Sequence, residues 1–336
     1  MADFDLAILL SAFEPVHFAH RAALEHGRAR AQRVLALVGS AGAARTLRHP
    51  WSADERVAML RAATNDMEPQ VLRVATVRDR LYDDPGWRRE VEQAVDAAAP
   101  GAQRIGLLVS SRSARRSSAF RAWPCLAVSG PPAPGFWDVR RGVFGNLPAR
   151  QELEAALPAT TRDFLEHYRA GPHFAALADE LGYIEGFRES WRHAPYPPVF
   201  VTTDAVVVHD GHILLIRRAH APGKGLWALP GGFVDQDETL LAGCLRELRE
   251  ETGLALSDEA MHRALRAQRT FDAPHRSLRG RTITHVFRFD LPAGERLDVA
   301  GGDDAADAQW MTLERFARME QETFEDHFHI AQRMLE

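Results

Sequence analysis

Three glutamates stand close together in the second half of the chain, at spacings that suit chemistry. Glu247, Glu250 and Glu251 lie in the stretch GGFVDQDETLLAGCLRELREETGL, which runs from Gly231 to Leu254. Separations of three and four residues put all three carboxylates on one face of a helix. Carboxylates this close repel one another unless cations compensate them. The cluster is therefore either a solvated helix face or a divalent-metal site, whose oxygen-only ligands suit Mg²⁺ or Mn²⁺.

The residues around the glutamates indicate how the chain would build such a site. Gly231 and Gly232 allow the preceding loop to turn tightly into the helix. Glu238 precedes Arg246 by eight residues, which predicts a salt bridge that holds the loop against the helix. Arg246 and Arg249 are adjacent to the glutamates in the sequence, and we expect both of these side chains to point elsewhere.

The whole pattern resembles the Nudix box, and every fixed position of the box matches between Gly232 and Leu254. In Nudix enzymes this helix holds a metal that bridges the diphosphate of a nucleoside diphosphate linked to another group. A metal there neutralises negative charge and lowers the pKa of a bound water molecule. The resemblance assigns metal binding and catalysis to Glu247, Glu250 and Glu251, and structural roles to Glu238, Arg246 and Gly253.

The substrate is suggested by segments outside the box. PGKGLWALPGGFVD, FDAPHRSLRGRTITHVFRF and FEDHFHI resemble the Nudix group that hydrolyses ADP-ribose in NAD metabolism. Arg276, Arg279 and Arg281 carry guanidinium groups that suit phosphate and ribose oxygens, although a solvated basic loop would look the same. Trp227 and Phe271 are candidates to stack on adenine, with a place in the core as the alternative. We also assign Gly231 and Gly232 to substrate binding.

A second candidate site lies in the first half, in the stretch SAFEPVHFAH. His17 and His20 follow a predicted strand and begin a predicted helix, where both would face a phosphate at the helix N-terminus. The stretch resembles the H-x-G-H signature of the adenylyltransferase superfamily, and further segments resemble nicotinamide mononucleotide adenylyltransferase. That resemblance implies ATP and nicotinamide mononucleotide as substrates, with His17 and His20 in catalysis. A bacterial fusion of this enzyme with an ADP-ribose Nudix domain is known, and the resemblance covers nearly the whole chain.

Several positions in the first half depart from the adenylyltransferase pattern. Ser11-Ala12 replaces the usual Gly-Arg, and Ala19 replaces the signature glycine. Trp137 stands where a phosphate-binding hydroxyl is expected, followed by Arg140, which we assign to substrate binding. The segment SSRSARRSSAFRAWP lacks the expected Lys-Asp pair. The resemblance therefore predicts the fold of this half, whereas its transfer activity stays open.

The elements that must position these residues differ between the two halves. Short apolar runs alternate with helical patterns in the first half, among them DLAILLSAF, RVLALVG, VLRVATVRD and RIGLLVSS. This alternation predicts a Rossmann-like, doubly wound parallel sheet for a nucleotidyltransferase-like domain at residues 1–148. Residues 149–196 read as a helical connector that ends at the proline-rich APYPP. Residues 197–336 are mixed α/β, with a hairpin around His209-Asp210-Gly211, and are predicted to form a Nudix α/β/α sandwich.

Composition excludes several classes of protein. The chain has 336 residues, a formal net charge of −5 and 46% hydrophobic residues, as in ordinary soluble proteins. No apolar run approaches the roughly 20 residues of a membrane span, and the N-terminus lacks the basic region of a signal peptide. Two isolated cysteines favour neither disulfides nor zinc. We expect a cytoplasmic protein that binds small nucleotides, neither nucleic acid nor membrane, with a homodimer left open.

Three functions compete on these observations. The first is a Mg²⁺-dependent or Mn²⁺-dependent Nudix hydrolase that cleaves ADP-ribose to AMP and ribose 5-phosphate. The second adds ATP-dependent adenylation of nicotinamide mononucleotide in the first half. The third is a non-catalytic ADP-ribose sensor that regulates transcription. Such sensors append a DNA-binding winged helix, for which we expect no room here, and they have no need of a complete box.

Overall fold

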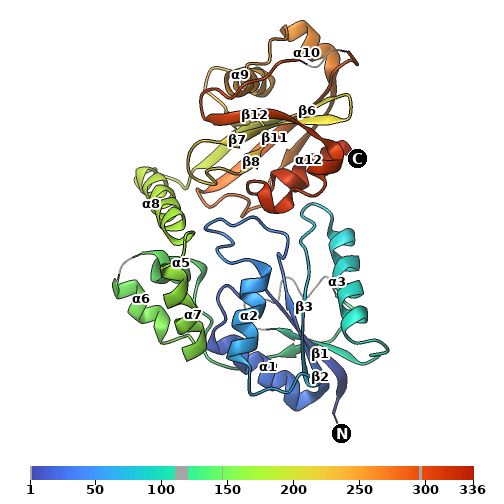
Figure 1. Cartoon of the computed structure of the whole chain (residues 1–336), viewed down its shortest axis with the longest axis vertical. Coiled ribbons are helices and arrows are strands. Elements are labelled where there is room, and N and C mark those ends of the chain that lie inside the picture. Colours follow the sequence, from blue (N-terminus) through green and yellow to red (C-terminus); the bar gives the residue numbers. More distant parts are fainter. Residues whose placement is uncertain (1, 110–119, 146, 295–296) are drawn as a thin grey trace. The chain divides into compact units, whose positions relative to one another are not determined.

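The structure is a computed structural model that describes residues 2–109, 120–145, 147–294 and 297–336 (Figure 1). The predicted features between residues 110 and 119 lie outside the described residues. The chain divides into two compact units, with the boundary between Leu181 and Gly182. The predicted division into 1–148, 149–196 and 197–336 stays a proposal. No helix in the described part of the chain is long and apolar enough to cross a membrane.

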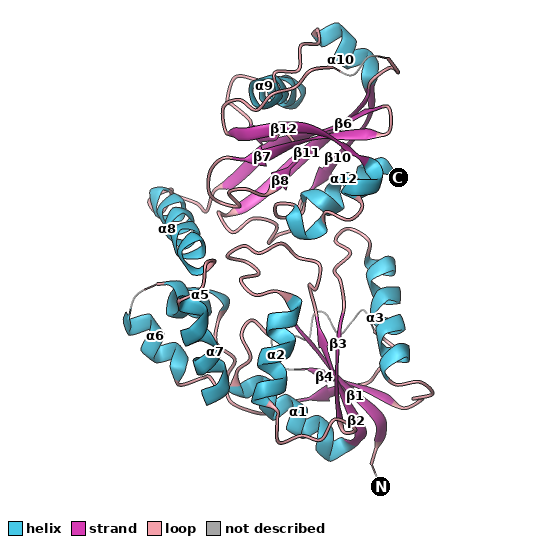
Figure 2. Ribbon diagram, viewed as in Figure 1, coloured by secondary structure: helices cyan, strands magenta, loops and turns pink. Residues whose placement is uncertain are grey.

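The first unit is built on a parallel sheet, as predicted (Figure 2). The middle strands of this sheet are buried at their centres, because helices cover a sheet of this kind on both faces, whereas the two edge strands are more exposed. The order β3-β2-β1-β4-β5 reverses direction between β1 and β4, and such a switch point opens a crevice at the carboxyl ends of the strands. The strands are β1 (Phe4–Ser11), β2 (Ala31–Val38), β3 (Leu72–Thr76), β4 (Ile105–Val109) and β5 (Cys125–Ala127).

Helices connect these strands and then continue the chain beyond them. The helix α1 follows β1 directly, so its N-terminus lies at the predicted crevice. The boundary between the two units falls inside α8. The helices are α1 (Phe18–Arg30), α2 (Ala53–Ala63), α3 (Asp84–Ala98), α5 (Phe136–Phe144), α6 (Leu147–Glu154), α7 (Ala159–Arg169) and α8 (Phe174–Ser190).

The second unit holds a mixed sheet of order β10-β11-β6-β7-β12, with β8 paired to β7 and β9 paired to β6. The strands β6 and β11 are parallel. The predicted hairpin is present, because β6 and β7 pair antiparallel around Asp210 and Gly211, which have φ values of 42° and 70°. The strands are β6 (Val199–His209), β7 (His212–Arg218), β8 (Trp227–Ala228), β9 (Gly231–Phe233), β10 (Leu265–Phe271), β11 (Arg281–Asp290) and β12 (Ala305–Thr312).

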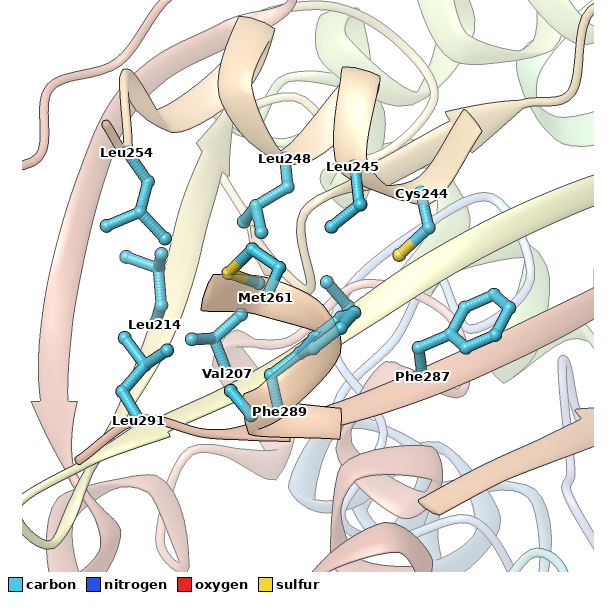
Figure 3. Packing of buried hydrophobic residues seen from close by; sticks show 12 residues of the cluster. Val207, Leu214, Cys244, Leu245, Leu248, Leu254, Met261, Phe287, Phe289 and Leu291 are labelled. Atoms are coloured by element: carbon cyan, nitrogen blue, oxygen red, sulfur yellow. The ribbon is translucent and has the colours of Figure 1, made fainter. Parts of the chain in front are cut away.

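Helices lie on both faces of this sheet, with α9 and α10 on one side and α12 on the other (Figure 1). Leu245 and Leu248 of α9 point toward Val207 and Phe289 of the sheet (Figure 3), and all four side chains are buried. This apolar stripe fixes the rotation of α9 and so decides where its glutamates face. The helices are α9 (Leu240–Thr252), α10 (Asp258–Ala264), α11 (Leu313–Phe316) and α12 (His327–Leu335), with a short 3₁₀ turn η1 at Glu320–Glu322.

Candidate functional site

The helix α9 carries the three glutamates, and local signals in the sequence define both of its ends. The hydroxyl of Thr239 accepts the backbone N–H of Ala242 at 3.2 Å and caps the N-terminus. Gly253 ends the helix with a φ of 64°, a left-handed conformation that glycine adopts without strain. Its N–H donates to the carbonyl of Arg249 at 2.8 Å. The carboxylates therefore stand on a helix of defined length.

Glu238 and Arg246 form the predicted salt bridge. Arg246 donates from Nε and Nη2 to the two carboxylate oxygens of Glu238, at 3.1 and 2.7 Å. It also donates to the carbonyl of Phe233 at 3.1 Å, which ties the glycine loop to the helix. The expectation that Arg246 points elsewhere is wrong, because its Nη1 also donates to Glu247 at 3.0 Å and to Glu250 at 2.9 Å. One guanidinium thus relieves the repulsion between these two carboxylates.

Glu251 has a different environment from Glu250. Its side chain is on the buried face of α9, and the residue is 3% exposed. Burial, with Glu247 and Asp204 nearby, raises the pKa of Glu251 to about 8. Burial also raises the pKa of Glu247, whereas Glu250 is exposed. An acid this deeply buried ionises readily at neutral pH only when a cation is beside it.

The twin glycines let the loop approach the carboxylates. The backbone N–H of Gly231 donates to Glu251 at 2.8 Å. A side chain at position 232 would displace the carboxylate of Glu247, because a Cβ there would lie 2.5 Å from its Oε1. A Cβ at position 231 would lie 2.1 Å from the carbonyl of Thr203, and the φ of 153° adds strain for any other residue. These glycines therefore shape the site around the glutamates.

The carboxylates are not arranged around a common point. Among the residues that the structure describes, no group of three or more His, Cys, Asp or Glu is placed to hold a metal. The cause is visible, since Arg246 binds Glu247 and Glu250. The donor set itself fits a hard divalent cation, because it supplies only carboxylate oxygens and includes the buried, cation-requiring Glu251.

The three arginines predicted to bind substrate have different surroundings. Arg276 is buried, and its Nε and Nη2 donate to the carboxylate of Asp326 at 3.0 and 2.8 Å, so this guanidinium serves the fold. Arg281 donates to the carbonyl of Asp272 and lies 3.7 Å from its carboxylate. Arg279 is half-buried, with its guanidinium 5.1 Å from the ring centre of Phe233.

The two aromatic residues proposed to stack on adenine are both in the core. Phe271 is 1% exposed and Trp227 is 8% exposed. Neither ring therefore offers an open face on which a base could stack. Both residues fit the alternative interpretation, a place in the core. Strand formation explains their burial, since Trp227 begins β8 and Phe271 ends β10.

Sequence reasoning missed a buried polar group behind the glycine loop. Asp204 of β6 accepts the hydroxyl of Thr284 at 2.5 Å. His327 of α12 accepts the backbone N–H of Leu229 at 3.1 Å, and burial lowers the pKa of its imidazole. A single acid inside the apolar run VTTDAVVV was the available signal, because a strand rarely buries a carboxylate without a reason.

The first unit contains a pocket of about 370 Å³ at the end of β1 and the start of α1. His17 and His20 both line it, with their rings stacked at 3.7 Å between centres. The backbone N–H of His17 donates to Nδ1 of His20 at 3.4 Å. Because Nδ1 accepts this bond, the proton of the neutral ring is assigned to Nε2. Nε2 lies 2.9 Å from the hydroxyl of Ser11. Burial and the neighbouring His17 hold the pKa of His20 well below its usual value. Other lining residues include Ser11, Ala19 and the segment 130–134.

Arg140, assigned from the sequence to substrate binding, lies in the interior of the first unit at 1% exposure. Its guanidinium donates to the carboxylate of Glu14 at 3.1 Å and to the carbonyl of Leu47 at 2.7 Å. Burial lowers the pKa of Arg140 to about 10. Glu14 also lies 3.0 Å from Nδ1 of His49 and 3.6 Å from Arg56. The arginine is therefore part of a closed ionic network and has no side open to a phosphate.

Comparison with known families assigns a domain to each unit. Residues 199–334 match the family described as NUDIX domain, and residues 8–81 match the family described as Cytidylyltransferase-like. The ADP-ribose pyrophosphatase of Methanocaldococcus jannaschii is 36% identical over 119 residues, which are 35% of this chain and 65% of that protein. A nicotinamide/nicotinic acid mononucleotide adenylyltransferase of Acinetobacter baylyi is 28% identical over 108 residues, 32% of this chain and 57% of that protein. The chain thus spans less than two thirds of either curated relative.

A solved structure is similar over both units. The crystal structure of a bifunctional NMN adenylyltransferase/ADP ribose pyrophosphatase from Francisella tularensis covers 99% of this chain and 98% of its own, with a TM-score of 0.93 and 27% identity. A second structure of that protein, complexed with AMP and a Mn ion, gives a TM-score of 0.91 at the same identity. This chain therefore shares the two-domain α/β fold of that bifunctional protein.

Proposed function

We propose that this chain, which joins a cytidylyltransferase-like domain to a Nudix domain, is a divalent-metal-dependent hydrolase that cleaves ADP-ribose to AMP and ribose 5-phosphate. One observation carries the proposal: the set of Nudix-box residues around α9 is complete, and it includes Glu251, a buried acid whose pKa burial raises to about 8. The likeness to the ADP-ribose pyrophosphatase of M. jannaschii supports the choice of substrate.

The residues of α9 and the glycine loop have separate tasks in this proposal. Glu247, Glu250 and Glu251 would hold Mg²⁺ or Mn²⁺, which when bound neutralises diphosphate charge and acidifies a water molecule. Gly231 orients Glu251 through its N–H, and Gly232 leaves the space beside Glu247 open. The Glu238–Arg246 bridge ties the glycine loop to the helix that carries the carboxylates.

The test is ADP-ribose hydrolysis by the full chain, with Mg²⁺ and with EDTA, in the parent and in Glu250→Gln. Glu250 is exposed, so this change should leave folding intact. We expect turnover to fall about a hundredfold or more, as for the loss of one charge-stabilising group. Glu259→Gln on α10 is the matched control, since Glu259 is exposed and pairs with Arg263 at the surface. Undiminished turnover in Glu250→Gln, or in EDTA, overturns the proposal.

A second candidate function is adenylation of nicotinamide mononucleotide with ATP in the first unit. The pocket that contains His17 and His20 favours it, because burial keeps His20 neutral and its Nε2–H can donate a hydrogen bond to a phosphate oxygen. The test is NAD formation from ATP and nicotinamide mononucleotide, compared between the parent and His20→Ala. A parent protein that forms no NAD rules this function out and leaves the hydrolase proposal unaffected.

A further inference from the structure

Arg218 is held in a fixed orientation at the end of β7. Its backbone N–H donates to the carbonyl of Leu226 at 2.9 Å. Its side-chain Nε donates to the carbonyl of Pro222 at 2.8 Å, and its guanidinium carbon lies 4.4 Å from the ring centre of Phe324. Gly223 packs closely against the same ring, since a Cβ at position 223 would lie 2.2 Å from a ring carbon of Phe324. The guanidinium is thus positioned by a carbonyl and a ring face, neither of which carries a full negative charge.

The positive charge of Arg218 has no ionic partner in the described part of the chain. No carboxylate oxygen lies within salt-bridge distance of it, and its two Nη atoms make no hydrogen bond to described residues. Burial lowers the pKa of Arg218, and Arg279 nearby lowers it further, while Glu325, Glu251 and Asp304 act in the opposite direction. Such a group costs folding free energy unless something else binds to it.

Arg279 shares this property, in contrast to its neighbours in the same loop. Arg276 is neutralised by Asp326, and Arg281 lies beside Asp272. Arg279 is half-buried and faces the ring of Phe233, and no carboxylate among the residues described here lies within salt-bridge distance of it. Within the described residues, its only side-chain hydrogen bond is a long one of 3.4 Å to the hydroxyl of Ser277.

Two guanidinium groups near each other without a shared acid are typical of an anion site. Their mutual repulsion would favour separation, and an anion between them converts that repulsion into attraction. Arg218 is also close enough to Glu251 of α9 for the two charges to affect each other's pKa. Phe233 follows Gly232 directly and accepts from Arg246, which ties Arg279 to the same loop.

We propose that Arg218 and Arg279 form an anion subsite that binds a phosphate of the nucleoside diphosphate substrate, beside the carboxylates of α9. The inference rests on the proposed hydrolase function and adds two residues that would bind the diphosphate directly. Planar forks with free N–H groups bind phosphate oxygens bidentately, so Arg218 positions substrate as well as neutralising it. Both residues contact substrate in this arrangement without exchanging protons with it.

The experiment compares Arg218→Ala, Arg218→Lys and Arg279→Ala with the parent in the full chain. ADP-ribose binding is measured by calorimetry in EDTA, where no turnover occurs, with inorganic pyrophosphate as competitor. Hydrolysis with Mg²⁺ then separates KM from kcat. We expect each alanine variant to weaken ADP-ribose and pyrophosphate binding about tenfold to a hundredfold and to raise KM similarly. Lysine should restore part of the affinity, because it keeps the charge but not the fork.

Arg217→Ala is the matched control, since Arg217 is the exposed neighbour of Arg218 on β7 and donates to the carbonyl of Gly225. It should bind ADP-ribose as the parent does. Affinities and KM within twofold of the parent in both Arg218→Lys and Arg279→Ala overturn the subsite, even if Arg218→Ala fails to fold. A parent that binds pyrophosphate through these arginines but does not hydrolyse ADP-ribose refutes the hydrolase proposal and retains the subsite.

Discussion

The two candidate sites bury charged side chains in opposite ways. In the first unit, Glu14 is enclosed with Arg140, Arg56 and His49, and burial alone would raise its pKa, but these neighbours outweigh burial and lower it. In the second unit, Glu251 is also buried, and its pKa rises to about 8 because burial outweighs the N–H of Gly231 and the charge of Arg218, which both lower it. A buried charge with an internal partner stabilises the fold, whereas one without a partner marks a place for a ligand.

The same contrast separates arginines that look alike in the sequence. Arg140 and Arg276 are each bonded to an acid within the protein, at 3.1 and 2.8 Å. Arg218 and Arg279 have no such acid within the described residues. If this comparison is sound, changing the first kind of arginine should harm stability, and changing the second kind should harm binding.

The largest expected effect is on the stability of the first unit in Arg140→Ala. Removing this guanidinium leaves Glu14 buried with less compensation, which should destabilise the unit by about 3–5 kcal/mol. Hydrogen exchange of peptides from β1 and β6 would assign the loss to one unit. Arg279→Ala should change protection by less than about 0.5 kcal/mol, because it is a partly exposed group without an ionic partner. Equal losses in the two variants would break the comparison.

The next effect is on hydrolysis in Glu251→Gln. Glutamine keeps the acceptor for the N–H of Gly231 but loses the negative charge, so ADP-ribose turnover should fall about a hundredfold to a thousandfold. Any NAD formation by the first unit should stay at the parent rate, since that site uses none of these carboxylates. When both activities are measured in one preparation, NAD formation is the control for ADP-ribose hydrolysis. A parallel loss of both would indicate that the units do not act separately.

A third effect concerns pH in metal-free protein. The pKa of Glu251 is near 4.5 when the chain is unfolded and about 8 when it is folded, so the folded state keeps a proton that the unfolded state has released. For this group, stability should therefore be greatest below pH ~4.5 and fall as pH rises toward ~8, by roughly 4–5 kcal/mol. Urea unfolding in EDTA across this range tests it. Glu251→Gln should flatten the slope, and an unchanged slope would assign the effect to other groups.

The smallest effect is expected in the first pocket. Ser11→Ala removes the hydroxyl that pairs with Nε2 of His20. The free energy of unfolding should fall by about 1 kcal/mol. The freed imidazole would then be available to a ligand, and NMR of the His20 ring would report the change in hydrogen bonding. Ser11→Thr serves as the control, since it keeps the hydroxyl. An imidazole signal that is the same in Ser11→Ala and the parent would show that Ser11 does not hold His20.

The sequence predicted the parts of this molecule that depend on local pattern. Apolar runs of strand length gave the parallel sheet of the first unit, and the spacing of Glu247, Glu250 and Glu251 placed them on one helix. The salt bridge from Arg246 to Glu238 followed from the same spacing. These features are decided by neighbours only a few residues away.

The errors concern side chains whose surroundings come from distant parts of the chain. Arg140 meets Glu14 across 126 residues, and Arg276 meets Asp326 across 50, so neither burial could be read from its own segment. Phe271 faces inward because of the position of its strand in the sheet. Arg218 belongs to no motif, and its burial distinguishes it from its exposed neighbour Arg217.

The hydrogen bonds of Arg246 to four partners have a consequence for how a metal would bind to α9. Its single guanidinium bonds to Glu238, Glu247 and Glu250 together with the carbonyl of Phe233. An incoming divalent ion would replace an existing positive charge at two of these acids, so loading is an exchange of cations. If α9 binds a divalent ion as proposed, the apparent affinity for that ion would therefore include the free energy of displacing Arg246 from these two carboxylates.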